Sequence, residues 1–214
     1  DTMAEAGQLG ARTRAGLNLA GVLIALVAWQ LASQLKGNEL VFPGPLAALD
    51  ALRELVTDSD ELRQAGYTLG RVVVGFAAGS VLGVLIALLL GSIRLVGESL
   101  EPVVHFLRSI TPVAWVVPAT IWFGVGESAL RFIVVYATFF PVVLNTLAGM
   151  AETPENKRRM AQSMGAGPFR TYLRVVVPNA VPYILTGMRL ALGYSFMSVV
   201  GAEMVAGNNG LGYL

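Results

Sequence analysis

The sequence predicts an all-α membrane protein, and three observations support this fold class. Hydrophobic residues make up 55% of the 214 residues and charged residues only 14%, with a mean hydropathy of +0.64. Uncharged runs recur at lengths close to the roughly 20 helical residues that cross a bilayer. Backbone in contact with lipid must satisfy its own hydrogen bonds, which such runs do as helices. We therefore expect a polytopic transmembrane helical bundle with five spans in one domain, residues 1–214.

The first span is expected at residues 17–35, an uncharged run that follows Arg12 and Arg14. A signal peptide is the alternative, because basic residues before an apolar run are also typical of a leader. The run is long for the apolar part of a leader and further spans follow it. A span is therefore the preferred interpretation.

Residues 36–66 form the longest polar stretch. Pro43, Gly44 and Pro45 mark a turn, because proline fixes φ and glycine tolerates the bend. Residues 46–56 carry apolar side chains at helical spacing. This spacing predicts a short amphipathic helix that lies on the membrane or packs against the spans.

The second span, residues 72–91, carries Gly75, Gly79 and Gly83 at steps of four. Small residues at this spacing share one helix face and let another backbone approach closely. Packing within the subunit is the preferred interpretation, and a seam between two copies is the alternative.

The remaining spans are expected at residues 102–123, 132–151 and 178–206. Pro112 and Pro118 interrupt the first of these, and each removes a helical hydrogen bond, so this span should be bent. A turn at residues 124–128 separates it from the fourth span. A second turn, at Asn208-Asn209-Gly210, marks the exit from the fifth.

The distribution of charge predicts the orientation. Residues 151–177 hold five basic residues against two acidic ones, whereas residues 36–66 hold three against six. Cytoplasmic loops are enriched in Lys and Arg. The N-terminus and the segment 151–177 are therefore expected inside, and residues 36–66 outside.

The segment 151–177 is amphipathic, basic and interrupted by glycine, so it cannot lie in hydrocarbon. Its spacing resembles the cytoplasmic EAA loop of permease subunits in bacterial binding-protein-dependent ABC importers. That pattern is Glu-Ala-Ala, three residues, Gly, nine residues, then Ile-x-Leu-Pro. Ala161, Gly165 and Pro178 match it, while Arg159 and Met160 replace the Glu and the first Ala.

The resemblance continues outside this loop, over roughly residues 65–214. It is closest to the nitrate, sulfonate and taurine branch, and it is carried by WVVP at 115–118, WFGVGES at 122–128, GMR at 187–189, AEM at 202–204 and GLGY at 210–213. The resemblance implies the type I ABC importer permease fold, which has a sixth span. Five spans account for the 214 residues, so the sequence is expected to lack the sixth.

The resemblance also implies that the segment 151–177 docks on an ATPase. The implied docking residues are Arg159, Met160, Ala161, Gln162, Met164, Gly165, Gly167 and Pro178. A helix over about residues 156–164 would present Met160 and Met164 on one face, where flexible methionines fill a partner's groove. Both glycines would permit a bend, and Pro178 would start or break the next helix. Packing of the two methionines on the subunit's own helices is the alternative.

Polar groups inside spans are costly and are therefore functional candidates. Arg189 could hold an anion with two donors, although a structural pair with carbonyls or a carboxylate is the preferred interpretation. Glu203 is expected near the outer face, as a gate or as an ion pair at the rim. Arg108, Thr111 and Asn145 are weaker candidates for the substrate path.

No motif for chemistry is present. Lys36 and Lys157 follow Leu and Asn, so neither belongs to a Walker A loop, and the sequence has no HExxH motif and no cysteine. Its single histidine, His105, is interpreted as a path or packing residue. We expect no catalytic residue, metal site or cofactor in this chain, with ATP and Mg bound by a partner ATPase.

The prediction is thus a permease subunit in the inner membrane of a bacterium, with its path at the seam of a homodimer. Two ATPase subunits would bind its cytoplasmic face and a substrate-binding protein its outer face. The expected substrate is a small anion such as nitrate, a sulfonate or taurine. A net charge of +1 argues against a nucleic-acid partner. A stand-alone secondary transporter or channel is the alternative, and a membrane enzyme is a weaker one.

Overall fold

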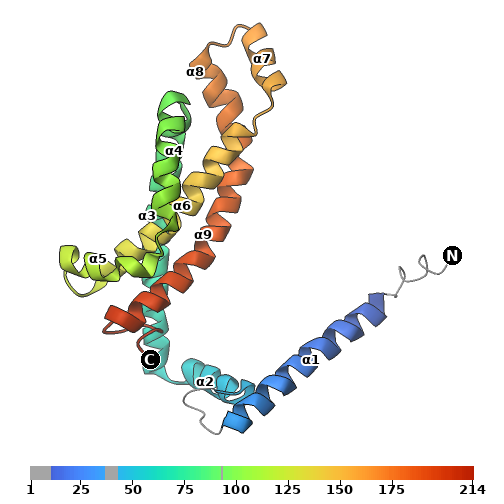
Figure 1. Ribbon diagram of the computed structural model, residues 1–214, viewed down its shortest axis with the longest axis vertical. Coiled ribbons are helices and arrows are strands. Elements are labelled where there is room, and N and C mark those ends of the chain that lie inside the picture. Colours follow the sequence, from blue (N-terminus) through green and yellow to red (C-terminus); the bar gives the residue numbers. More distant parts are fainter. Residues whose placement is uncertain (1–10, 37–42, 93) are drawn as a thin grey trace, which may run out of the picture. The chain divides into compact units, whose positions relative to one another are not determined.

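The computed structural model describes residues 11–36, 43–92 and 94–214, and these residues are helical apart from short turns (Figure 1). The chain forms two compact units, Asp1–Leu62 and Arg63–Leu214. The expected all-α fold is confirmed. Among the described residues, four helices are long and apolar enough to cross a membrane, or five if one bent helix pair counts as a span.

The N-terminal unit holds α1 (Ala11–Lys36) and α2 (Pro45–Thr57). The predicted span 17–35 lies in α1, whose apolar stretch Asn18–Leu35 is only 6% buried. The predicted helix 46–56 is α2; Gly44 caps its N-terminus and Pro45 occupies its first turn, where proline's missing N–H is not needed. Trp29 of α1 donates its indole N–H to the carbonyl of Pro43, two residues before α2, at 3.1 Å.

Three helices form the core of the second unit: α3 (Ser59–Ser92), α6 (Glu127–Ala151) and α9 (Val177–Ala206). The glycines of α3 lie directly on α6. A Cβ at Gly79 would meet Thr138 Cβ at 2.7 Å and the Val135 carbonyl at 2.8 Å, and Gly75 and Gly83 are similarly close to α6. The glycine stripe therefore packs within the subunit, as the preferred interpretation held.

Helices α6 and α9 also pack closely. Gly187 of α9 lies against Asn145, and Gly149 of α6 lies against the ring of Tyr183. The hydroxyls of Thr138 and Ser195 hydrogen bond across the pair at 2.7 Å. Small residues and hydroxyl pairs of this kind bring helices together where lipid removes the hydrophobic driving force.

Helices α3 and α6 run in the same direction, and α9 runs against them. Arg71, in the first half of α3, contacts the first residue of α6 and Glu203 near the end of α9. At the other end, Tyr172 donates to the Leu88 carbonyl of α3 at 2.5 Å and contacts Met150 of α6. The chain between α3 and α6 must therefore return from one end of the bundle to the other.

That return is made by α4 (Arg94–Ser109), a 3₁₀ turn (Pro112–Trp115) and α5 (Val116–Phe123). The axes on either side of the break differ by 83°, and Figure 1 shows α4 beside α3 with α5 turning away. The expected bend is confirmed and lies at Pro112. Pro118 causes no second bend, because it lies in the first turn of α5, where its N–H would be unpaired.

The fifth span begins earlier than predicted. Helix α8 (Pro168–Thr171) continues through a π-helical turn (Tyr172–Val176) into α9, so that Pro168–Ala206 is helical throughout. The expected range 178–206 matches α9 itself, and the continuous helix begins earlier, at Pro168. Val176 packs against Ala87 and Met150 in a buried cluster. This burial stabilises the helical turns that precede the apolar run.

Candidate functional site

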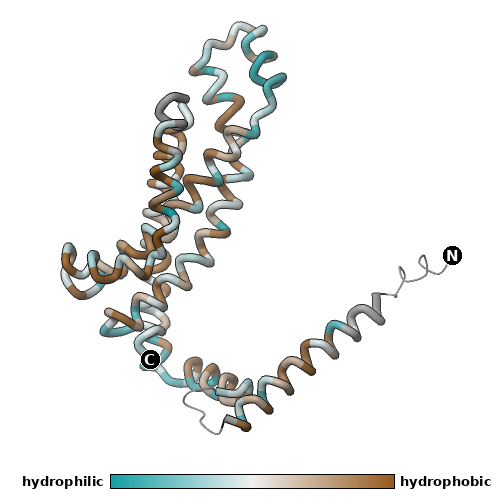
Figure 2. The backbone as a smooth tube through the Cα atoms, in the orientation of Figure 1, coloured by the Kyte–Doolittle hydropathy of each residue, from teal (hydrophilic) through white to brown (hydrophobic). Residues whose placement is uncertain are grey.

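Helix α7 (Glu155–Ser163) is the predicted docking helix, close to the expected range 156–164. Polar contacts fix it to the bundle. Arg158 donates to the Met150 carbonyl at 2.9 Å, and Lys157 donates to the side-chain oxygen of Asn179 at 3.4 Å. Arg159 pairs with Glu155 one turn earlier at 3.3 Å. The basic side chains of α7 thus hold this helix across the ends of α6 and α9. Figure 2 shows α7 as hydrophilic.

Three large apolar side chains project from this region. The exposed fractions are 64% for Met160, 86% for Met164 and 75% for Phe169. The alternative in which both methionines pack on the subunit's own helices is therefore wrong for this chain. Exposed apolar groups rimmed by polar ones are typical of sites that interact with another protein or with a membrane. We call these three residues the exposed methionine patch. Of the other residues predicted for docking, Ala161 is half-buried and Gln162 is exposed.

Gly165 ends α7 with a φ of +82°. Its N–H bonds the Gln162 carbonyl at 2.9 Å and the next N–H bonds the Ala161 carbonyl at 3.0 Å, as in a left-handed helix cap. A side chain at this position would meet no atom of the described residues within 4 Å, so only the backbone demands glycine. Gly167 differs: its φ of −66° is open to any residue, and it serves as the cap of α8. The bend that both glycines were expected to permit therefore depends on Gly165 alone.

Pro178 lies in the first turn of α9, as expected for a proline that starts a helix, and it does not break the continuous helical stretch Pro168–Ala206. It lies in a continuous helix just after the π-helical turn, where the Val177 N–H reaches the Tyr172 carbonyl five residues back. A π-helical turn shifts the hydrogen-bond register, and the proline that lacks an N–H follows at the point of that shift.

The candidates for the substrate path separate into three groups. Arg189 is exposed on α9 and makes no hydrogen bond or ion pair with the described residues, so the preferred structural pair is not found there. Thr111 caps the 3₁₀ turn at the break after α4, with its carbonyl bound by the Ala114 N–H at 2.9 Å. Arg108 and Asn145, by contrast, line a common cavity of about 250 Å³.

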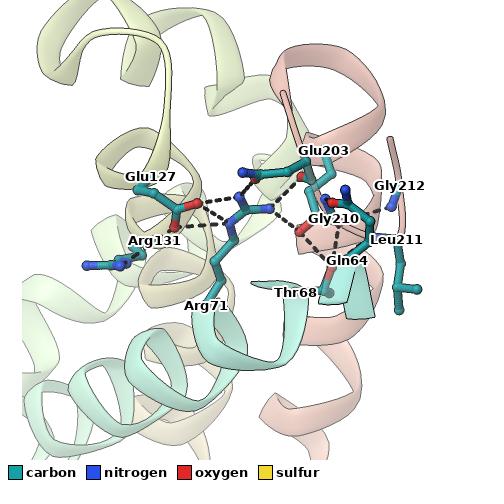
Figure 3. A network of polar contacts seen from close by, with 10 residues as sticks. Gln64, Thr68, Arg71, Glu127, Arg131, Glu203, Gly210, Leu211 and Gly212 are labelled. Carbon is teal, nitrogen blue, oxygen red and sulfur yellow. Dashed lines mark hydrogen bonds and ion pairs between the residues drawn. The ribbon is translucent and has the colours of Figure 1, made fainter. Parts of the chain in front are cut away.

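Glu203 belongs to a buried network at the end of the bundle opposite α7 (Figure 3). Its side chain is 1% exposed. Arg71 donates to it at 2.6 Å and Thr68 at 2.9 Å, and the Gly212 N–H donates at 3.0 Å. Of the two roles considered for Glu203, the structure supports an ion pair.

Arg71 is the centre of this network and was not singled out from the sequence. It is 2% exposed. It also donates through Nε to Glu127 at 3.1 Å and through Nη1 to the Asn209 carbonyl at 2.8 Å. Its contacts join α3, α6, α9 and the turn after α9. One feature of the sequence could have identified Arg71. It lies directly before the uncharged run 72–91, and a lone arginine at the boundary of a span needs a partner.

Comparison of the sequence with known proteins agrees with this architecture. Residues 79–214, more than half of the chain, match the family described as the inner membrane component of binding-protein-dependent transport systems. The chain is 30% identical to the nitrate import permease protein NrtB of Synechocystis sp. over 201 residues, which covers 90% of this chain and 72% of that protein.

Two relatives are named as permeases for another anion. The bicarbonate transport system permease protein CmpB of Synechococcus elongatus is 32% identical over 209 residues, covering 92% of this chain and 74% of its own length. Its namesake in Synechocystis sp. is 28% identical, covering 90% and 72%. The chain therefore belongs to the family of inner membrane components of binding-protein-dependent transport systems, the permease subunits of ABC importers, and resembles its nitrate-type branch.

Proposed function

We propose that this chain forms the membrane path of an ATP-driven importer for a small oxyanion. A substrate-binding protein would deliver the anion to the outer face, and two copies of the chain would enclose the path between them. Two partner ATPases would bind the cytoplasmic face and supply ATP and Mg. Family membership supports this assembly, and the alternative of a stand-alone transporter or channel lacks an explanation for the exposed methionine patch.

The observation that carries the proposal is the geometry of α7. A helix held by charged contacts presents Met160 and Met164 to the outside, beyond the ends of the apolar helices. Methionine adapts its shape to a groove on another protein. The cap at Gly165 then sets the angle between this helix and the long helix that ends in α9. Movement of a bound ATPase would pass to the membrane helices through this short connection.

The proposed orientation puts α7 in the cytoplasm, together with the N-terminus, and the Arg71 network at the outer end. The excess of basic residues in 151–177 supports it. The chain contains no cysteine, so single cysteines report topology cleanly. Ser163→Cys should resist an impermeant thiol reagent in intact cells, while Ser59→Cys should react. Labelling of Ser163→Cys from outside would reverse the orientation.

The names of the relatives guide the proposed substrate. Nitrate and bicarbonate are both small, planar anions with one charge, and the named relatives are permeases for these two. We propose an anion of this class for this chain, in preference to the larger sulfonate or taurine that the sequence motifs alone also allowed.

Reconstitution tests the proposal. The permease, the ATPase and the binding protein encoded beside it should together give ATP-dependent uptake of nitrate or bicarbonate into vesicles. The double variant Met160→Glu, Met164→Glu should remain in the membrane, because both side chains are exposed, but lose the ATPase in a pull-down. Ser59→Glu, at the exposed first residue of α3, is the control and should retain it. ATPase binding by the double variant equal to that of the wild type would contradict the proposal.

A further inference from the structure

We propose that the cavity at the break after α4 is the site where the transported oxyanion is held inside the membrane, with Arg108 as its main ligand. The inference rests on the proposed function and assigns a substrate site to it. Residues from three elements line the cavity: Arg108 and Ile110 at the break, Tyr136 and Asn145 of α6, and Leu190 and Tyr194 of α9.

The cavity lies partway along the long helices and is open on one side, since Arg108, Leu190 and Tyr194 in its wall are exposed. Tyr136 occupies the central part of α6, Glu127–Ala151, and Tyr194 lies near the middle of α9, Val177–Ala206. An arginine at such a depth is expensive unless it faces water, a partner or a polar path. Arg108 makes no hydrogen bond or ion pair with the described residues, and the described lining includes no acid. The site therefore offers one uncompensated positive charge.

The backbone beside the cavity also indicates water. Ile110 and Thr111 are not helical, and the chain turns there by 83°. Irregular backbone at membrane depth occurs where it is buried in protein or lines a water-filled cavity. Ile110 lines this cavity directly. The break thus opens the interior to water at the same place where the charge of Arg108 is available.

The other polar groups complete a set of donors. Tyr136 donates its hydroxyl to the Leu107 carbonyl at 2.5 Å, so it fixes the wall next to Arg108. Asn145 donates to the Pro141 carbonyl at 2.8 Å, which leaves its second amide hydrogen for a ligand. The Tyr194 hydroxyl makes no hydrogen bond with the described residues. An anion in the cavity could therefore accept hydrogen bonds from Arg108, Asn145 and Tyr194.

Size and shape favour a small planar oxyanion. The guanidinium group presents two parallel N–H donors, which match two oxygens of a trigonal anion. The volume of about 250 Å³ exceeds that of such an anion, so several waters, at roughly 30 Å³ each in the liquid, would share the cavity. A hydrated site binds an ion weakly enough to release it again, as conduction requires.

The test uses the full transporter in vesicles, with nitrate and ¹⁴C-bicarbonate as probes and saturating loaded binding protein. Arg108→Gln should lower the number of anions carried per ATP hydrolysed by about tenfold, the expected effect of losing one charge-assisted hydrogen-bonding group. ATPase co-purification and the concentration of binding protein for half-maximal rate should not change, because Arg108 acts after docking. Arg108→Lys should recover part of the loss, since it keeps the charge but not the two-donor fork.

Two further variants provide a second test of the cavity and a control outside it. Tyr194→Phe removes one exposed hydroxyl without a change in packing, and a two- to threefold loss of uptake is expected of it even if Arg108→Gln fails to assemble. Arg63→Gln, an exposed arginine outside the cavity, should be normal. Normal coupling in Arg108→Gln, or a loss in Arg189→Gln alone, would overturn the site. Transport of taurine in place of nitrate and bicarbonate would overturn the assigned anion class. A wild type without ATP-driven uptake would instead overturn the proposed function.

Discussion

At the scale of single residues, backbone conformation separates two glycines that look alike in the sequence. Gly165 and Gly167 lie in the same exposed segment, and a Cβ at either would meet no described atom within 4 Å. Only Gly165 has a positive φ, at +82°. An L side chain in that conformation costs about 1 kcal/mol or more. This conformational strain would arise in the connection between α7 and the long helix that ends in α9.

Gly165→Asp should therefore weaken ATPase binding or uncouple ATP hydrolysis from uptake, while the permease stays in the membrane. Gly167→Asp is the matched comparison. Its φ of −66° suits any residue, and Asp is a favoured helix cap, so its effect should be much smaller. ATPase pull-down and uptake in reconstituted vesicles measure both variants. Equal behaviour of the two would show that the cap at Gly165 has no part in coupling.

The buried ion pair makes a second prediction at this scale. Arg71→Ala leaves Glu203, which is 1% exposed, without its charged partner. Loss of one member of a buried pair costs about 3–5 kcal/mol, so the variant should unfold at a clearly lower temperature in detergent. The double variant Arg71→Met, Glu203→Leu removes both charges and should recover most of the loss. A double variant as unstable as Arg71→Ala would mean that the pair is not the cause.

Residues that act locally could be predicted from the sequence, and residues that act through distant partners could not. The exposure of Met160 and Met164 follows from a short basic segment with helical spacing. Arg71 and Glu203 are 132 positions apart, and no local pattern reports which charges will meet. The same holds for Arg108 and Asn145, which α4 and α6 bring to one cavity.

At the scale of elements, close helix contact depends on where glycines fall. Gly70 and Gly79 both lie in α3, but a Cβ at Gly70 would meet no described atom, whereas one at Gly79 would meet Thr138 and the Val135 carbonyl below 3 Å. Spacing in the sequence predicted the stripe. The partner helix could not be predicted, because α4 follows α3 in the chain and α6 is the helix that packs on these glycines.

The paired substitutions test this packing. Gly70→Ala should stabilise the protein by about 1 kcal/mol, because alanine is the better helix former at an open site. Gly79→Ala should destabilise it, since a backbone carbonyl of α6 would have to move. Thermal unfolding of both variants in one detergent gives the comparison. A Gly79→Ala variant as stable as Gly70→Ala would show that α3 and α6 lie further apart.

The boundaries of the fifth span show a limit of hydropathy. The apolar run suggested a start at residue 178, yet the helix starts at Pro168. Amphipathic turns such as Tyr172–Val176 bury one face against Ala87 and Met150 while their charged residues remain outside. An average over a window of residues cannot detect that arrangement.

At the scale of the whole bundle, the two ends of α3, α6 and α9 differ in chemistry. One end carries the buried network around Arg71, which joins the first half of α3 and the start of α6 to the end of α9. The other end carries α7 and the exposed methionine patch. The cavity with Arg108 lies between them. In the proposed orientation, the network would lie at the outer end, the proposed anion site in the middle and the ATPase-docking surface at the cytoplasmic end.

The most direct test of that arrangement is a cross-link from α7 to the ATPase. The chain has no cysteine, so Met164→Cys supplies a single thiol on a side chain that is 86% exposed. Treated with a short bifunctional thiol reagent, vesicles that hold the assembled transporter should yield a permease–ATPase adduct with Met164→Cys and none with Ser59→Cys. An adduct with Ser59→Cys, or none with Met164→Cys while ATP-driven uptake is normal, would contradict docking through α7.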